Sequence, residues 1–158
     1  MSTFELAIPT VLRHEGGYCW VEGDAGGETN FGISKRSYPN VDIKNLTSAD
    51  ASVIYKRDWW DHYGYGRIDA QMLATKIFDT AVNIGPKPAH SIAQKAVGVI
   101  VDGILGIVSI SAINASQPAQ LLSQLQNRQA AYYEELVSYN PNLSKFLVGW
   151  MNRAFDRD

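Results

Sequence analysis

The chain has 158 residues, of which 14 are Lys or Arg and 16 are Asp or Glu, so its formal net charge is −2. This length corresponds to one domain, or to one domain with a small appendage. Hydrophobic residues make up 46% of the chain and charged residues 19%, a composition that excludes a disordered protein. A pI near 5.9 gives no electrostatic footprint for nucleic acid or for an anionic membrane. One cysteine excludes an internal disulfide.

The first fifteen residues, MSTFELAIPTVLRHE, lack the basic start and the uninterrupted apolar run of a secretory signal peptide. No stretch approaches the roughly 20 apolar residues that cross a bilayer, and the longest apolar run, residues 96–113, is interrupted by glycines, serines and Asp102. We therefore expect a protein that is made in soluble form in a cytoplasm, without membrane insertion. Where it acts is a separate question.

A helix is predicted at the N-terminus. Ser2 and Glu5 have the spacing of a capping box, with Ser2 as the N-cap. A stripe at helical spacing follows: Phe4, Ile8, Val11 and, at its end, Glu15. Pro9 predicts a kink or a late start of the regular helix, and Gly16-Gly17 predicts its end. The carboxyl of Glu15 is expected to be half-buried, and apolar surroundings favour the protonated form of a carboxyl.

A small β-hairpin or irregular loop is predicted for residues 18–34, which contain several glycines between short apolar stretches. The rest of the chain predicts helices. A capping box at Thr47-Ser48-Ala49-Asp50 opens a helix to about residue 63. Further helices are predicted over about residues 69–84, 89–97, a short segment after Ser109, 118–138 and 144–155.

Gly85-Pro86-Lys87-Pro88 is a strong helix breaker and the best internal boundary. It divides the chain into a part over residues 1–85 and a helical part over residues 86–158, which we expect to pack together as one globule. The predicted fold class is mainly α, with one small β element near residues 20–34.

The residues best suited to chemistry are Glu15, Asp24 and Thr29, which lie within fifteen positions. Cleavage of a glycosidic bond needs a carboxylic acid that stays protonated, and a second group that stabilises the cationic transition state, acts as nucleophile or places water. Glu15 on an apolar stripe suits the first role. Asp24 in a polar, glycine-rich turn suits the second, and the hydroxyl of Thr29 suits a water ligand. The alternative is a solvated helix end for Glu15 and ordinary turn chemistry for Asp24.

A family resemblance adds to this pattern. HEGGY (14–18) and GDAGGETNFGIS (23–34) resemble the signature of glycoside hydrolase family 108, the lysozyme-like muramidases of phages and bacteria, some of which were labelled secretion activators. Similar segments continue along nearly the whole chain. They are IYKRDWWD (54–61), IFDTAVNIGPKPA (77–89), RQAAYY (128–133) and GWMNR (149–153). Residues 97–114 look like the peptidoglycan-binding segment that accompanies the family.

The resemblance implies a lysozyme-like helical fold and an enzyme that hydrolyses the β-1,4 bond between N-acetylmuramic acid and N-acetylglucosamine in peptidoglycan. The Glu of the family's E-G-G-Y motif is the catalytic acid, and this role carries over to Glu15. The order Glu, Asp, Thr is also similar to that of phage T4-type lysozymes, which supports Asp24 and Thr29 by analogy. The resemblance implies no metal and no cofactor.

The chain departs from the family pattern at two places. Glu28 stands where the family often has Pro or a small residue, which adds a third carboxylate near the site. Ile107-Val108-Ser109 replaces the usual Pro-x-Thr step of the peptidoglycan-binding segment.

Several other residues are candidates for substrate binding: Tyr18, Trp20, Asn30, Asp79 and Asn83. Tyr18 and Trp20 lie beside the catalytic loop, where aromatic rings can contact sugars. Asn30 could orient Glu15 or an N-acetyl group, or it could be a turn residue. Asp79 and Asn83 share a helical face and could line the floor of a cleft, or they could form a buried structural pair. Trp59, Trp60, Tyr63 and Tyr65 could stack on sugar rings, although aromatic residues at helical spacing more often belong to a core.

Other catalytic classes fit poorly. His14, His62 and His90 lack the spacing of a zinc site, and Cys19 lies in no nucleophile motif. Two alternatives to a hydrolase stay open, namely a non-catalytic wall-binding or secretion-assisting protein and a lytic transglycosylase. The partner implied by the resemblance is bacterial peptidoglycan. A phage-encoded enzyme would be made in the host cytoplasm and would act on the cell wall in the periplasm, with a holin-like pore or another export route, and we expect a monomer.

Overall fold

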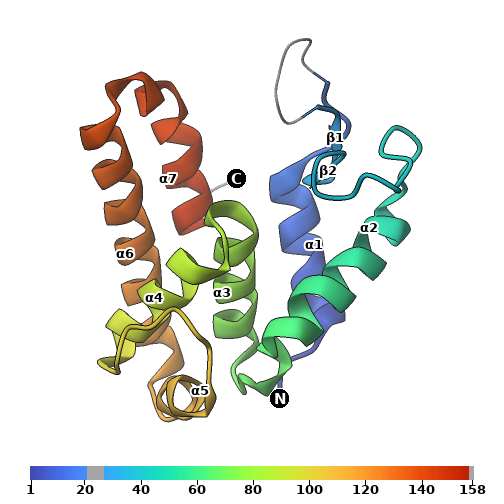
Figure 1. The fold of residues 1–158 in the computed structure, drawn as a ribbon. Helices are drawn as coiled ribbons and strands as arrows, with labels where there is room; N and C mark the ends of the chain where they lie inside the picture. Colours follow the sequence, from blue (N-terminus) through green and yellow to red (C-terminus); the bar gives the residue numbers. More distant parts are fainter. Residues whose placement is uncertain (21–26, 157–158) are drawn as a thin grey trace.

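The computed structural model describes residues 1–20 and 27–156, which form mainly α-helices and one two-stranded antiparallel sheet (Figure 1). The α-helices are α1 (Phe4–Glu15), α2 (Ser48–Tyr55), α3 (Gln71–Ile84), α4 (Pro86–Val97), α5 (Ile107–Asn114), α6 (Pro118–Tyr139) and α7 (Leu147–Phe155). Shorter turns of other helix types are η1 (Lys56–Asp61), η2 (Tyr65–Arg67) and η3 (Pro141–Phe146). The sheet pairs β1 (Thr29–Asn30) with β2 (Ile33–Ser34). The predicted fold class, mainly α with a small hairpin, is confirmed.

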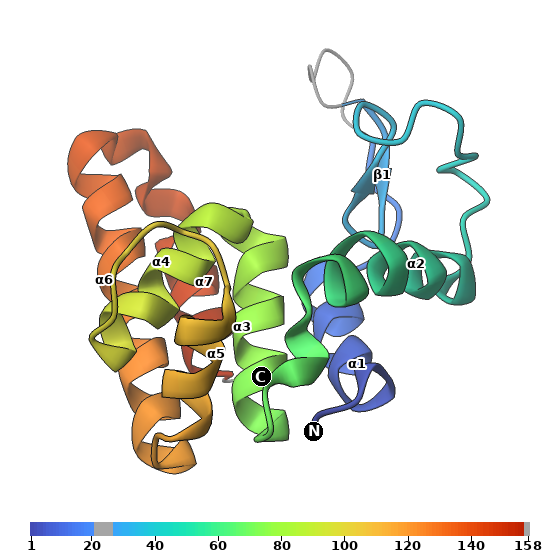
Figure 2. The ribbon, with the colours of Figure 1, turned by 60° about the horizontal axis from the view of Figure 1, so that its bottom comes forward.

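Helix α3 lies at the centre of the molecule. It packs against α1 on one side and against α4 and α6 on the other. Figures 1 and 2 agree that α1, α2 and the hairpin lie on one side of α3, with α4 to α7 on the other. Among the described residues, no helix has the length and apolar character needed to cross a bilayer. The consequence of this layout is that side chains from both halves of the chain meet around α3.

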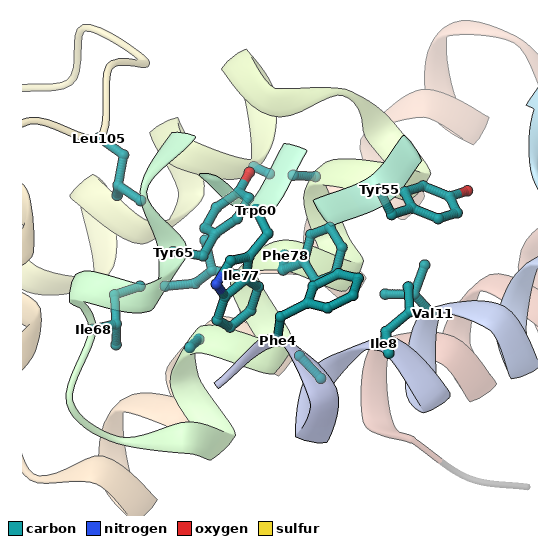
Figure 3. Packing of buried hydrophobic residues seen from close by; sticks show 14 of the residues in the cluster. Phe4, Ile8, Val11, Tyr55, Trp60, Tyr65, Ile68, Ile77, Phe78 and Leu105 are labelled. Atoms are coloured by element: carbon teal, nitrogen blue, oxygen red, sulfur yellow. The ribbon is translucent and has the colours of Figure 1, made fainter. Parts of the chain in front are cut away.

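An aromatic core fixes α1 against α3 (Figure 3). The rings of Phe4 and Trp60 lie 5.9 Å apart, and those of Trp60 and Phe78 lie 5.5 Å apart, both edge to face. Ile8 and Val11 of the predicted stripe are also buried. Burying each of these side chains contributes about 1.5–3 kcal/mol. Trp60 and Tyr65 are both buried, so they are core residues rather than residues that stack on sugar rings.

The start of α1 differs from the prediction. The helix begins at Phe4 after Thr3, and the hydroxyl of Ser2 donates to the carbonyl of Tyr65 at 3.2 Å, so the assignment of Ser2 as N-cap is wrong. The helix also continues through Pro9, so a late start is wrong. Pro9 removes one backbone hydrogen bond, but the burial of Phe4, Ala7 and Ile8 holds the first turns in place. The capping box of Thr47 and Asp50 is confirmed.

Other boundaries move by a few residues. Helix α3 begins two residues later than predicted, and α5 begins at Ile107 rather than after Ser109. Helix α4 begins at Pro86 itself, because proline has no N–H to lose at the first position of a helix. The region before α7 is a 3₁₀ turn, so α7 begins at Leu147 rather than at residue 144. The helix predicted to reach residue 63 contains the π-helical turn η1.

Candidate active site

Glu15 is the last residue of α1, and its side chain is 18% exposed. The helix ends here because Gly16 adopts a positive φ of 70°, which few residues other than glycine tolerate. The backbone N–H of Gly16 still donates to the carbonyl of Leu12 at 3.2 Å. The carboxyl group of Glu15 is therefore held at a well-defined helix end and is largely shielded from solvent, close to the half-buried position expected from the sequence.

An arginine from the other half of the chain contacts this carboxyl. Nη2 of Arg153, on α7, donates to Oε1 of Glu15 at 2.7 Å. The same Nη2 donates to Oδ1 of Asp79 at 2.9 Å, and Nε donates to Oδ2 of Asp79 at 3.3 Å. The guanidinium group thus joins a carboxyl group of α1 to one of α3. The arginine side chain is only 10% exposed, so solvent screens these contacts little.

Asp79 lies at the bottom of this network, with its side chain 3% exposed. Burial opposes its charge, but a hydrogen bond from His14 and the guanidinium of Arg153 outweigh burial and hold the pKa of Asp79 below its usual value. An ionised carboxylate can only accept hydrogen bonds. Nδ1 of His14, which lies 2.9 Å from Oδ1 of Asp79, therefore bears a hydrogen and is the donor of this hydrogen bond. Nε2 of His14 lies 3.4 Å from Oδ1 of Asp156. We name the four residues Glu15, His14, Asp79 and Arg153 the charge network.

The β-hairpin covers the other side of Glu15. Its two-residue turn places Phe31 at a φ of 49° and Gly32 at a φ of 75°. A bulky residue such as Phe31 rarely adopts this conformation, and the hydroxyl of Tyr55 fixes the turn by donating to the carbonyl of Phe31 at 2.9 Å. A Cβ atom on Gly32 would lie 2.5 Å from Oε2 of Glu15 and 2.5 Å from the hydroxyl of Tyr55. Only glycine leaves room for both groups.

Tyr55 is almost fully buried, and burial raises the pKa of its hydroxyl far above the usual value, so it stays protonated as a donor. Its ring and Gly32 also line a surface hollow together with Tyr38, Asp58 and Trp59. A second hollow is lined by three members of the charge network, His14, Asp79 and Arg153, and by Lys76 and Gln126. Oε2 of Glu15 faces Gly32 and Tyr55, which line the first hollow.

The predicted catalytic residues are placed in part. Thr29 begins β1 in the hairpin that covers Glu15, and its backbone pairs with that of Cys19 in both directions at 2.8 Å. The hydroxyl of Thr29 donates to the carbonyl of Cys19 at 3.4 Å. Asp24 lies outside the described residues. Among those that are described, no group of three or more His, Cys, Asp or Glu side chains could hold a metal ion.

Two of the predicted sugar contacts are exposed. Tyr18 is 47% and Trp20 is 60% exposed, and the hydroxyl of Tyr18 donates to Glu28 at 3.1 Å. Glu28, the additional carboxylate of this chain, thus accepts a hydrogen bond from the neighbouring Tyr18.

The remaining candidates are engaged inside the protein. Asn30 is buried, and its amide donates to the carbonyls of Ile43 and Leu46, each at 3.1 Å, so the structure favours its alternative as a loop-stabilising residue. Asn83 accepts a hydrogen bond from the hydroxyl of Tyr133 at 2.5 Å. Asp79 belongs to the charge network. Asp79 and Asn83 share a helix but contact different partners.

The sequence interpretation missed three residues of the site: Gly32, Tyr55 and Arg153. All three lie within motifs of the family resemblance, which attached no role to them. No local pattern indicates that a residue 138 positions away in the chain contacts Glu15.

A mainly α fold that joins a partly buried glutamate to a hairpin and to a C-terminal helical half is consistent with the lysozyme-like class of proteins. Family models agree with this class. Residues 8–85 match the family described as glycosyl hydrolase 108, and residues 88–155 match a predicted peptidoglycan domain. The chain belongs to the glycosyl hydrolase 108 family, with the predicted peptidoglycan domain as its second half.

A solved structure supports the same assignment. The structure of SagA from Brucella abortus is 26% identical in sequence and superposes with a TM-score of 0.72, covering 98% of this chain and 96% of that one. A search of curated proteins gave no match. The family assignment supports a peptidoglycan-related glycoside hydrolase with peptidoglycan as its partner.

Proposed function

We propose that the protein is a muramidase, which hydrolyses the β-1,4 bond between N-acetylmuramic acid and N-acetylglucosamine in peptidoglycan. The observation that carries the proposal is the placement of Glu15. Its carboxyl group is shielded, held at a helix end, and faces the turn of the hairpin that bears Thr29. A shielded carboxyl beside a polar loop is the arrangement that glycosidic cleavage requires.

In the proposed reaction, Glu15 gives its proton to the oxygen of the glycosidic bond. The bond between this oxygen and the anomeric carbon breaks, and its electron pair stays on the oxygen. Asp24 stabilises the cationic sugar or orients the attacking water, and Thr29 holds that water. This water attacks the anomeric carbon on the face opposite Glu15, which forms a new C–O bond and inverts the configuration at that carbon. The proton that the water loses is released to solvent, and solvent returns a proton to Glu15.

The polysaccharide is proposed to cross the hairpin turn next to Glu15. The hollow formed by Gly32, Tyr38, Tyr55 and Trp59 adjoins the turn, and the partly exposed rings of Tyr38 and Trp59 are suited to sugar faces. Tyr18 and Trp20 add two exposed rings close to the catalytic loop in the chain. The same proposal places the action of the protein, as a monomer, on the cell wall in the periplasm after release by a holin-like pore or another export route.

The test is digestion of purified peptidoglycan by the wild type, by Glu15→Gln and by Glu5→Gln. The Glu15→Gln change keeps the size of the side chain and removes only the acid, so we expect a loss of activity of at least about 100-fold. Glu5 lies exposed in the first turn of the same helix, so Glu5→Gln is the matched control and should keep wild-type activity. If Glu15→Gln clears peptidoglycan at the wild-type rate, the mechanism is wrong.

Mass spectrometry of the products separates the alternatives. A reducing N-acetylmuramic acid end identifies a hydrolase, and an anhydro-sugar identifies a lytic transglycosylase. Binding to peptidoglycan without fragments identifies a wall-binding or secretion-assisting protein. Proton NMR of the first product anomer reports inversion or retention, and a retained anomer would refute the role given to Thr29.

A further inference from the structure

We propose that Arg153 is the positioning residue of Glu15, so that the C-terminal half of the chain completes the active site built on the N-terminal half. This inference rests on the proposed function, because it concerns the same proton transfer. Its basis is a buried contact, since Nη2 of Arg153 lies 2.7 Å from Oε1 of Glu15 and the arginine side chain is 10% exposed. The two residues come from α7 and α1.

The guanidinium group distinguishes the two oxygens of Glu15. Oε1 accepts from Arg153, whereas Oε2 faces Gly32 and the hydroxyl of Tyr55, which line the aromatic hollow. Arg153 therefore leaves Oε2 to carry the proton and to present it on the side of the hollow. When Oε2–H transfers its proton to the glycosidic oxygen, negative charge develops on the carboxyl group, and the guanidinium is already in place to stabilise it.

Arg153 cannot turn away from Glu15 without breaking other contacts. Its Nε and Nη2 both bind Asp79, and Asp79 is held in turn by His14. The planar fork of an arginine suits two carboxyl groups at once, which a lysine cannot match. The fork fixes the guanidinium in the plane that reaches Glu15.

The backbone around Arg153 is also tied to the N-terminal half. The ammonium of Lys76, on α3, donates to the carbonyls of Arg153 at 3.2 Å and Ala154 at 2.6 Å, which caps the end of α7. Asp156 also binds Arg13 of α1 at 2.8 Å, but both side chains are about half exposed, so this ion pair contributes little to the docking. The position of Arg153 is therefore determined by how α7 docks on α3.

The charged and titratable groups around Glu15 determine the expected pH dependence. They are Arg153 from α7, Asp79 from α3, His14 from α1 and Tyr55 from α2. Arg153 is the cation among them that binds the carboxyl directly. Its removal leaves the negative charge of Asp79 close to Glu15, which makes loss of the Glu15 proton harder.

The experiment compares Arg153→Met and Arg153→Lys with Arg13→Gln, using a soluble peptidoglycan fragment as substrate. Arg13 forms an ion pair with Asp156 at the same contact of α1 with α7, so it controls for the loss of an arginine there. For Arg153→Met we expect kcat to fall about 10- to 100-fold with KM within about threefold, and the alkaline limb of the kcat profile to move to higher pH. Arg153→Lys should lie between the wild type and Arg153→Met. Arg13→Gln should keep kcat within about twofold and leave the pH profile unchanged.

A folded Arg153→Met variant with wild-type kcat and an unchanged pH profile would overturn the proposal, and circular dichroism at the assay temperature establishes whether it is folded. If it does not fold, Arg153→Lys decides, because its ammonium can replace only one of the two carboxyl contacts. A folded Arg153→Lys variant with wild-type kcat then overturns the proposal as well. Wild-type protein that releases no sugar overturns the proposed function itself, so the two failures are distinguishable.

Discussion

The hairpin turn provides the sharpest test of how closely the structure surrounds Glu15. We expect Gly32→Ala to lower activity far more than it lowers the fraction of folded protein. A Cβ atom at this position would lie 2.5 Å from Oε2 of Glu15 and from the hydroxyl of Tyr55, where ordinary contact begins at 3.4 Å. Each group must therefore move by about 0.9 Å or the turn must shift by that amount. A displacement of about 1 Å at a reacting group costs on the order of 100-fold in rate.

The stability cost has two parts. An alanine at a φ of 75° costs about 1–2 kcal/mol, and overpacking against Glu15 and Tyr55 adds about 1–3 kcal/mol. Gly64→Ala is the matched control. Gly64 has a φ of 69°, and its Cβ would lie 2.5 Å from Nε of Arg67, at the flexible end of a side chain remote in sequence from the charge network. Both variants should unfold at lower urea concentrations than the wild type. Under conditions where both variants are fully folded, only Gly32→Ala should hydrolyse peptidoglycan about 100-fold more slowly. Equal activities of the two variants would refute the close packing of the turn on Glu15.

Three further predictions concern stability and salt. Burial lowers the pKa of Lys76 to about 8, so between pH 8 and pH 10 the unfolded chain binds more protons than the folded one. As the pH rises over this range, the free energy of unfolding of the wild type, measured in urea, should increase by up to about 2 kcal/mol relative to that of Lys76→Met. The same dependence of the unfolding free energy on pH in both proteins would contradict the burial of this ammonium. Tyr133→Phe should cost about 1–3 kcal/mol, because Asn83 and Gln129 both lose their partner, and a variant as stable as the wild type would count against these hydrogen bonds. Raising NaCl from about 50 to 200 mM should change the rate of peptidoglycan clearing by less than about twofold, because a chain with a net charge of −2 is not drawn to an anionic wall; a steep loss of rate would disprove this inference.

Local patterns in the sequence predicted what depends on neighbouring residues. The stripe of Phe4, Ile8 and Val11 becomes the buried face of α1, since residues three and four apart share one side of a helix. The capping box at Thr47 forms as predicted, because it depends only on Thr47 and Asp50, three residues apart. Ser2 has an equally suitable local pattern, but its hydroxyl binds the carbonyl of Tyr65, 63 residues away. A tertiary contact there outweighs the cap, and no local pattern reveals it.

The candidate site shows the same division. Glu15 and Thr29 could be singled out because they lie close together in a short glycine-rich segment. The partners of Glu15 could not, because Gly32 approaches it through a tight turn and Arg153 reaches it from α7. For Asn30 the sequence left open a ligand contact and a turn role, and in the structure its amide nitrogen donates to two backbone carbonyls. A buried loop must satisfy such carbonyls, and the sequence does not indicate which side chain does so.

Two carboxyl groups share one arginine in this site, and their surroundings assign them different roles. Asp79 is 3% exposed and receives hydrogen bonds from His14 and Arg153, which keep it ionised and make it a poor proton donor. Glu15 is 18% exposed and binds Arg153 through Oε1, while Oε2 faces the turn. When Glu15 carries a proton, Arg153 and Asp79 still form a balanced pair, so protonation leaves no buried charge without a partner. When Glu15 has released the proton, Arg153 stabilises the new charge. The network therefore accommodates both states that an acid catalyst must pass through, and it does so for Glu15 rather than for Asp79.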